Sequence, residues 1–227
     1  MSVEKNLQNL SGKIARACDR SGRDPEEVSI VAVTKYVSVK TAQEAVEAGI
    51  RHLGENRLGE GLTKVEALRE GVTWHFIGTL QSKKVKKMID QFQYIHSLDR
   101  LSLAKEIDNR TAEGTRKKCF VQVNVLGEES KAGLSPEEVP AFIEELEHYP
   151  AIEIIGLMTM APLTDNEQEL RQTFRKLKQL RDDIRNRKYS HAPCNELSMG
   201  MSNDFEIAIE EGATFIRVGS SLVGKEK

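Results

Sequence analysis

The stretch VSIVAV at residues 28–33 decides the fold class. It is short, rich in β-branched residues and apolar at nearly every position, whereas a strand with one solvent-facing side alternates apolar and polar residues. Such a stretch is typical of a strand buried on both faces, as in a parallel sheet covered by helices. Thr34 and Lys35 follow directly, so polar side chains come where this strand ends.

Short apolar stretches of this kind recur along the sequence and alternate with helical patterns. Apolar residues at three- and four-residue steps predict a leading helix over 3–20. We expect strands at 28–33, 51–54, 74–78, 94–96, 118–125, 152–157, 196–198 and 214–218. We expect helices over 38–48, 55–69, 81–90, 99–111, 135–148, 167–187 and 205–210, with Asp99 and Ser135 as caps.

Eight strands with seven helices between them predict an α/β protein, a single (β/α)8 TIM barrel. The extra N-terminal helix would take the place of a missing eighth one. No Gly/Ser linker or charge block divides the sequence, so we expect one domain over 1–227. The alternative is an open doubly wound sheet, against which the strand count argues.

Composition excludes several classes of protein. The net charge is −2, with 33 basic and 35 acidic residues, so nucleic acid is not an expected partner. No run approaches the roughly 18 apolar residues of a membrane span. The three cysteines form no CxxC pair, and no carboxylate cluster or other metal motif is present. We therefore expect a cytoplasmic protein with reduced thiols and no metal; without a long apolar surface stripe, it should be a monomer.

Polar residues follow the predicted strands all round the sequence. In parallel α/β barrels the functional site lies at the carboxyl ends of the strands, so these residues should gather in one site. They are Thr34, Lys35, Glu55, Asn56, His75, Gly78, His96, Ser97, Asn124, Met158, Thr159, Ser198, Ser202, Asn203, Arg217, Gly219 and Ser220.

Lys35 is the most specific of these candidates. Its ammonium would emerge at the mouth of an apolar barrel, where desolvation lowers the pKa of an amine. A neutral amine is what Schiff-base formation with an aldehyde requires. The alternative is a lysine that ends a strand by chance and reaches solvent.

The second candidate is RVGSS at residues 217–221, which closes the last strand. Gly219 would let the backbone approach a ligand, and a following helical turn would present N–H groups to a phosphate. Barrels often bind phosphate after strands 7 and 8, although the segment could also be an ordinary turn. Once the barrel closes, this turn and Lys35 become neighbours.

Other residues point more weakly to function. We interpret His75 as a hydrogen-bonded structural residue and 83–87 as a solvated helix face rich in lysine. Four methionines are expected to pack or to line the site: Met158, Met160, Met199 and Met201.

Several stretches resemble the pyridoxal 5′-phosphate (PLP) homeostasis protein family. They are VAVTK (31–35), GEN (54–56), WHFIGTLQSKK (74–84), VQVN (121–124), EESKAGL (128–134), GLMTMAP (156–162), LSMGMSNDFEIAIEEGAT (197–214) and RVGSSLVG (217–224). One departure is Lys83, where the family usually has asparagine, so a contact made by that asparagine is not expected here.

The resemblance implies a barrel of the alanine racemase N-terminal-domain type that holds PLP as a Schiff base on Lys35. By the same resemblance, Arg217 would face the pyridine nitrogen. The phosphate would be held by Ser202, Gly219 and Ser220, with Asn56, Met158 and Ser198 near the cofactor.

The resemblance also implies a role in intracellular PLP (vitamin B6) homeostasis without robust catalysis and without catalytic residues. Arginine beside the ring nitrogen disfavours its protonation and weakens the ring as an electron sink. A racemase also needs a second base from another domain, for which we expect no room after the eighth strand. Expected partners are PLP, other B6 vitamers and PLP-dependent apo-enzymes. The alternatives are a PLP-dependent amino-acid racemase, a cofactor-free aldolase using Lys35, and a scaffold.

Overall fold

The computed structural model, which describes residues 2–128, 131–224 and 226, is a closed barrel of eight parallel strands. Each strand pairs with the next, and β8 pairs with β1, so the predicted (β/α)8 architecture is confirmed. The strands are β1 (Ser29–Val33), β2 (His52–Glu55), β3 (Thr73–Phe76), β4 (Tyr94–Leu98), β5 (Lys117–Gln122), β6 (Ile152–Met158), β7 (Glu196–Met201) and β8 (Phe215–Val218).

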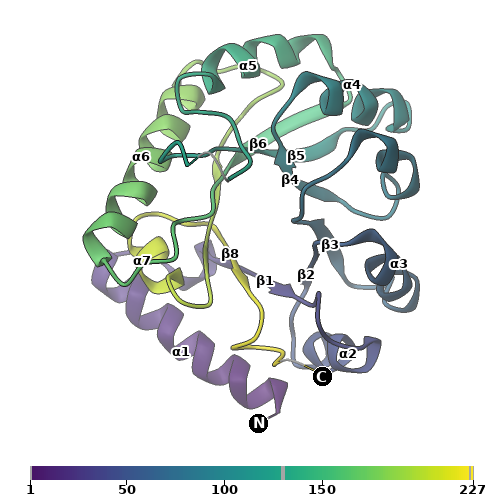
Figure 1. Cartoon of the computed structure of the whole chain (residues 1–227). Helices are drawn as coiled ribbons and strands as arrows, with labels where there is room; N and C mark the ends of the chain where they lie inside the picture. The colour runs from purple at the N-terminus through teal and green to yellow at the C-terminus, as the bar shows by residue number, and fades with distance from the viewer. Residues whose placement is uncertain (1, 129–130, 225, 227) are drawn as a thin grey trace.

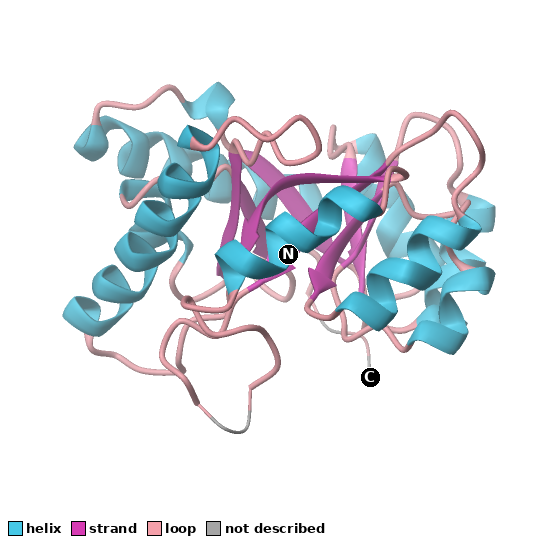
Figure 2. Ribbon diagram, turned by 90° about the horizontal axis from the view of Figure 1, so that it is seen from above, coloured by secondary structure: helices cyan, strands magenta, loops and turns pink. Residues whose placement is uncertain are grey.

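Helices surround the strands on the outside of the barrel (Figures 1 and 2). The α-helices are α1 (Val3–Ser21), α2 (Val39–Glu47), α3 (Leu58–Ala67), α4 (Leu101–Arg110), α5 (Val139–Glu145), α6 (Glu167–Asn186) and α7 (Phe205–Glu210). Three short 3-10 helices are η1 (Pro25–Glu27), η2 (Ser82–Lys87) and η3 (Leu146–His148). Helix α1 packs against both α7 and α2, so the N-terminal helix does occupy the place of an eighth helix.

Three predictions about the helices were wrong. The α-helix expected over 81–90 is the 3-10 helix η2, whose four lysines are exposed as predicted but have no acidic neighbours within the helix to offset their repulsion. Helix α5 begins at Val139 rather than near Ser135, with Pro140 in its first turn and a turn at 136–138 before it. Asp99 does not cap α4; Arg100 precedes the helix, and the two side chains pair at 2.6 Å.

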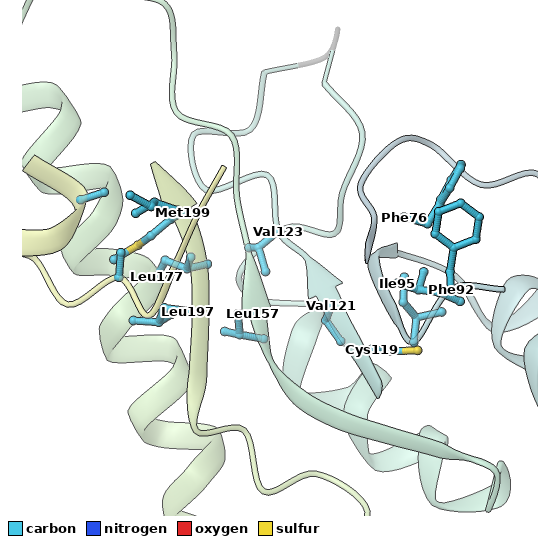
Figure 3. Close-up of a cluster of buried hydrophobic side chains, with 14 of the residues drawn as sticks. Phe76, Phe92, Ile95, Cys119, Val121, Val123, Leu157, Leu177, Leu197 and Met199 are labelled. Atoms are coloured by element: carbon cyan, nitrogen blue, oxygen red, sulfur yellow. The ribbon is translucent and has the colours of Figure 1, made fainter. Parts of the chain in front are cut away.

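Alternation along each strand divides the buried side chains into two groups. On β1, Ala32 belongs to the layer between strands and helices, whereas Val31 points into the barrel. The outer layer is continuous around the molecule; Figure 3 shows Leu157 and Leu197 of two strands beside Leu177 of α6. The inner group is small and consists of Val31, Phe120, Ile155, Met158 and Phe215. Much of the remaining interior is polar.

Among the described residues, none of the helices combines the length and the hydrophobicity that a membrane-spanning segment requires.

Candidate functional site

A cavity of about 830 Å³ lies where the strands end. It brings together residues that follow several strands, and eight of the seventeen strand-end residues expected to form one site line it. The predicted residues on its wall are Lys35, Asn56, Gly78, Ser202, Asn203, Arg217, Gly219 and Ser220. Met160 and Met201 also line it, whereas Met158 and Met199 are packed in the interior, as expected for methionines that line or pack.

Lys35 reaches the cavity because side chains alternate at the end of β1. Val33 lines the cavity, and Thr34 points the other way, where its hydroxyl donates to the carboxylate of Glu55. Lys35 therefore faces inward again. It is half-buried, and its ammonium lies 4.9 Å from the centre of the Tyr36 ring. Its desolvation is consequently less complete than the apolar strand before it suggested.

Arg217 forms the floor of the cavity and is only 5% exposed. Its Nη1 donates to Ser198 Oγ at 2.6 Å and its Nη2 to the Thr159 carbonyl at 2.8 Å. Burial lowers the pKa of Arg217 to about 10, against the opposing effect of Asp204, so the guanidinium stays charged at neutral pH. A guanidinium has five N–H donors, which leaves donors beyond these two bonds for a ligand.

Two loops present unpaired amide groups on one side of the cavity. Among the described residues, the N–H groups of Ser202, Asn203, Ser220 and Ser221 have no protein acceptor. The two loops meet where Ser221 Oγ donates to Ser202 Oγ at 3.2 Å. We call these four N–H groups the amide cluster. Unpaired N–H groups on adjoining turns can bind anions such as phosphate.

The residues after β8 form a turn at 220–223, and no helix is present there among the described residues. The N–H groups of Leu222 and Val223 donate to the Gly219 carbonyl at 2.8 and 3.0 Å. A Cβ atom on Gly219 would meet Val33 at 3.5 Å, which is ordinary contact. The fold itself therefore does not require glycine at this position.

Asn56 and Gly78 meet on the opposite wall. A Cβ atom on Gly78 would lie 2.3 Å from the Asn56 carbonyl oxygen, so only glycine allows this approach. The Asn56 side-chain oxygen is buried and has no hydrogen-bond partner in the described part of the chain. An orphaned buried acceptor beside a cavity indicates a site for a ligand or water.

Two predicted site residues lie beneath the cavity instead of on its wall. Met158 packs against the inner apolar group, and Ser198 is fully buried, in contact with Arg217. Asn124 instead organises the following loop, because its amide donates to the Glu128 carbonyl at 2.8 Å. Two residues of the EESKAGL stretch, Glu129 and Ser130, lie outside the described residues.

Gln122 and Asp204 are among the polar residues that line the cavity and that sequence reasoning missed. The fifth strand was expected to continue to Val125, but it ends at Gln122, which is therefore its last residue. Asp204 directly follows two predicted site residues, Ser202 and Asn203, so its place in the same loop could have indicated it. Burial raises the pKa of Asp204, which also accepts a hydrogen bond from the Met201 N–H.

Comparison with known proteins gives consistent similarities. Residues 6–227 match the family described as alanine racemase, N-terminal domain. A protein of Aquifex aeolicus named pyridoxal phosphate homeostasis protein is 41% identical over 229 residues, with both chains fully covered. The structure of PipY of Synechococcus elongatus with PLP bound has 35% identity and a TM-score of 0.85, covering 98% of this chain and all of that one.

Alanine racemases share the fold only. The Clostridium difficile enzyme has a TM-score of 0.75 at 16% identity, and the match covers 97% of this chain and 56% of that one. At this identity the likeness extends to the barrel and carries no argument about activity.

Proposed function

The chain belongs to the pyridoxal phosphate homeostasis proteins, within the alanine racemase N-terminal-domain family, and from that premise we propose that it binds PLP on Lys35 and serves PLP homeostasis. One observation carries the proposal: a primary amine, a buried guanidinium and three of the four residues of the amide cluster line the same cavity. PLP offers a matching group to each of these, an aldehyde, a pyridine nitrogen and a phosphate.

The residues fit the phosphate and the ring. The amide cluster, together with Gly219 and the hydroxyls of Ser202 and Ser220, would hold the phosphate, because unpaired N–H groups are donors that suit an anion. Arg217 would donate to the pyridine nitrogen with an N–H that the protein does not use. Asn56 would place its orphaned side-chain oxygen beside the ligand.

Lys35 would supply the covalent link. When bound, PLP supplies an aldehyde with which a neutral primary amine condenses to a C=N bond, with loss of one water molecule. Met158 and Ser198 would act from beneath the cavity, Met158 through packing and Ser198 through its hydrogen bond to Arg217.

We further propose that the protein is not a robust catalyst and has no catalytic residues. The support is the charge of Arg217: a guanidinium that stays protonated donates a hydrogen bond to the pyridine nitrogen but does not protonate it. A neutral ring withdraws electrons more weakly than a protonated one. The names of the relatives support a homeostatic role as well.

The remaining proposals concern partners and place of action. We propose a single-domain, monomeric, cytoplasmic protein that also binds other B6 vitamers and delivers PLP to PLP-dependent apo-enzymes. Support for the cytoplasm comes from Cys18, Cys119 and Cys194, which are free and buried. Reduced thiols are usual in that compartment. Light scattering of the purified protein would test the monomer.

The decisive experiment is covalent mapping of the cofactor. The purified protein is incubated with PLP, its visible spectrum is recorded before and after borohydride, and the modified peptide is identified by mass spectrometry. We expect a visible band that borohydride removes and a reduced adduct on Lys35. An adduct on another lysine, or none, would overturn the assignment.

Lys35→Ala and Lys83→Ala form a matched pair for this experiment, because Lys83 is exposed on η2. Only Lys35→Ala should lose the band. A screen for racemisation and transamination with the loaded parent protein tests the racemase alternative; sustained turnover would refute the non-catalytic role. A protein that stays colourless with PLP would favour the aldolase or scaffold.

A further inference from the structure

Three histidines form a hydrogen-bonded row through the barrel interior. Nδ1 of His52 lies 2.9 Å from Nε2 of His75, and Nδ1 of His75 lies 2.8 Å from Nε2 of His96. Nδ1 of His96 lies 2.8 Å from Ser198 Oγ, which accepts from Arg217 at 2.6 Å. We call the three rings the histidine row. It ends at the residue that forms the cavity floor.

The strand register places the three histidines at successive levels along the barrel, from its lower end toward the cavity. His75 pairs with Gly54, two residues beyond His52, and Tyr94 pairs with His75, two residues before His96. Each histidine therefore lies two residues closer to the cavity than the one before it. His52, the first residue of β2, is half-buried, whereas the other two are fully buried. Only the His52 end of the row is within reach of water.

The donors and acceptors along the row favour one direction of hydrogen bonding. Because a guanidinium only donates, the hydroxyl of Ser198 accepts from Arg217 and donates its own proton to Nδ1 of His96. A neutral imidazole has one donor and one acceptor nitrogen, so Nε2 of His96 then donates to His75, and Nε2 of His75 donates to His52. In the reverse direction the Ser198 oxygen would accept from both Arg217 and His96, and its own buried proton would have no acceptor among the described contacts.

The surroundings keep the row neutral. Burial lowers the pKa of His75 and His96 well below the usual range, and Arg217 and the neighbouring histidines lower that of His96 further. Burial also lowers the pKa of His52. The rings otherwise face aromatic side chains: Tyr94 stacks on His75 at 4.4 Å.

The other groups packed against the row complete its environment. Phe120 lies 4.3 Å from His96, and Phe215 contacts all three rings. The Lys118 ammonium lies 5.4 Å from the Tyr94 ring, and Glu153 is opposite Lys118 in the strand register. The nearest charge to the upper end of the row is thus Arg217, a cation, which opposes protonation of the rings.

We propose that His52, His75 and His96 are positioning residues that hold Arg217 through Ser198, and that a proton taken up by His52 releases this hold on the bound cofactor. A proton on Nδ1 of His52 removes the acceptor at the lower end of the row. The Nε2–H of His75 then faces a second donor, and the row can relieve this clash only by reversing its direction, which removes the hydrogen bond that Ser198 donates to His96. The expected effect on PLP binding rests on the proposed PLP site, but the histidine tautomers can be measured without PLP.

The first test uses the ligand-free protein. Long-range nitrogen–proton NMR at about pH 8 distinguishes the two tautomers of a neutral histidine. The parent should show the Nε2–H tautomer at all three positions. Ser198→Ala should release His96 into a mixture of tautomers, whereas Ser97→Ala, on the other face of β4, should not. An Nδ1–H tautomer at His75 or His96 in the parent would overturn the proposal.

The second test is PLP affinity as a function of pH. At about pH 8, Ser198→Ala and His52→Phe should bind PLP roughly tenfold more weakly than the Ser97→Ala control, as for loss of one hydrogen bond to a charged group. His52→Gln keeps an acceptor that does not titrate. It should bind more tightly than His52→Phe, and its affinity should fall less than that of the parent below pH 6.5, the usual histidine pKa.

The outcomes separate the two proposals. If the parent does not bind PLP, the proposed function fails, and the tautomers still decide whether the row is ordered. If the parent binds PLP but Ser198→Ala and His52→Phe match Ser97→Ala at every pH, the positioning role is wrong and the PLP site stands. Ser198→Ala removes a single oxygen, so it serves as the test if His52→Phe does not fold.

Discussion

The ammonium of Lys64 lies 2.8 Å from a carboxylate oxygen of Glu55, and both side chains are almost fully buried. The pair lies in the barrel wall between β2 and α3. Lys64 also donates to the carbonyl of Thr34, and the Thr34 hydroxyl donates to Glu55. Because Thr34 precedes Lys35, this network fixes the main chain from which the reactive amine extends.

Lys64→Met should destabilise the protein by about 3–5 kcal/mol, because it leaves the Glu55 carboxylate buried without its partner. Replacing both members, as in Glu55→Leu with Lys64→Met, should recover most of that loss. Urea unfolding followed by circular dichroism measures both variants. If the free energy of unfolding of Lys64→Met were within about 1 kcal/mol of that of the parent, water would have to reach the Glu55–Lys64 pair.

Ser202→Ala should weaken PLP binding while the barrel stays folded. The hydroxyl of Ser202 sits at the junction of the two loops that carry the amide cluster, and it has no bond to the barrel core among the described contacts. Loss of one hydrogen bond to a phosphate should cost roughly tenfold in affinity. Ser102→Ala, an exposed serine on α4, is the control. Equal dissociation constants for the two variants would contradict the phosphate assignment.

The closed barrel could be predicted because its signals are local. Stretches such as 28–33 are apolar on both faces, and their number alone indicates closure. Lys35, Arg217 and Gly219 could be placed on the site because each directly follows or ends such a stretch. Side chains alternate between the two faces of a strand, and this alternation decides which residue faces the cavity. An error of one residue in the predicted strand would place Thr34 in the cavity instead of Lys35.

The histidine row could not be predicted in the same way. His52, His75 and His96 meet only through the register between three strands and the shear of the closed barrel, which no local pattern contains. His75 was correctly interpreted as a hydrogen-bonded structural residue, but its partners were not. The buried Lys64 was missed because a lysine within a helix is usually exposed.

Acid should destabilise the folded protein through its buried histidines. The pKa values of His75 and His96 are lowered by burial, so below pH 6.5 the unfolded chain binds protons that the folded protein excludes. Their contribution to stability is complete above pH 6.5 and is lost as the pH falls toward the lower folded values. The limiting slope is about 1.4 kcal/mol per pH unit for each histidine.

Urea midpoints between about pH 5 and 8 measure this slope. His75→Gln should flatten it, whereas His148→Gln, which changes an exposed histidine on η3, should not. The lowered pKa values of Glu210 and Glu211 act in the same direction but at lower pH, near the usual carboxyl range. A slope in His75→Gln equal to that of the parent would show that the buried rings are not its source.

Gly78 and Gly219 both line the cavity, yet they should respond differently to substitution. A Cβ on Gly78 would overlap the Asn56 carbonyl at 2.3 Å, so Gly78→Ala should cost stability, about 2 kcal/mol or more, and displace Asn56. A Cβ on Gly219 meets Val33 at an ordinary 3.5 Å, so Gly219→Ala should unfold at the same urea concentration as the parent. Gly219→Leu adds bulk at the same position and should bind PLP more weakly still than Gly219→Ala. The fold tolerates a side chain at position 219. If PLP affinity falls while stability does not, the loss must therefore come from contact between the new side chain and the ligand. Gly219→Leu that retains both stability and affinity would place the phosphate elsewhere.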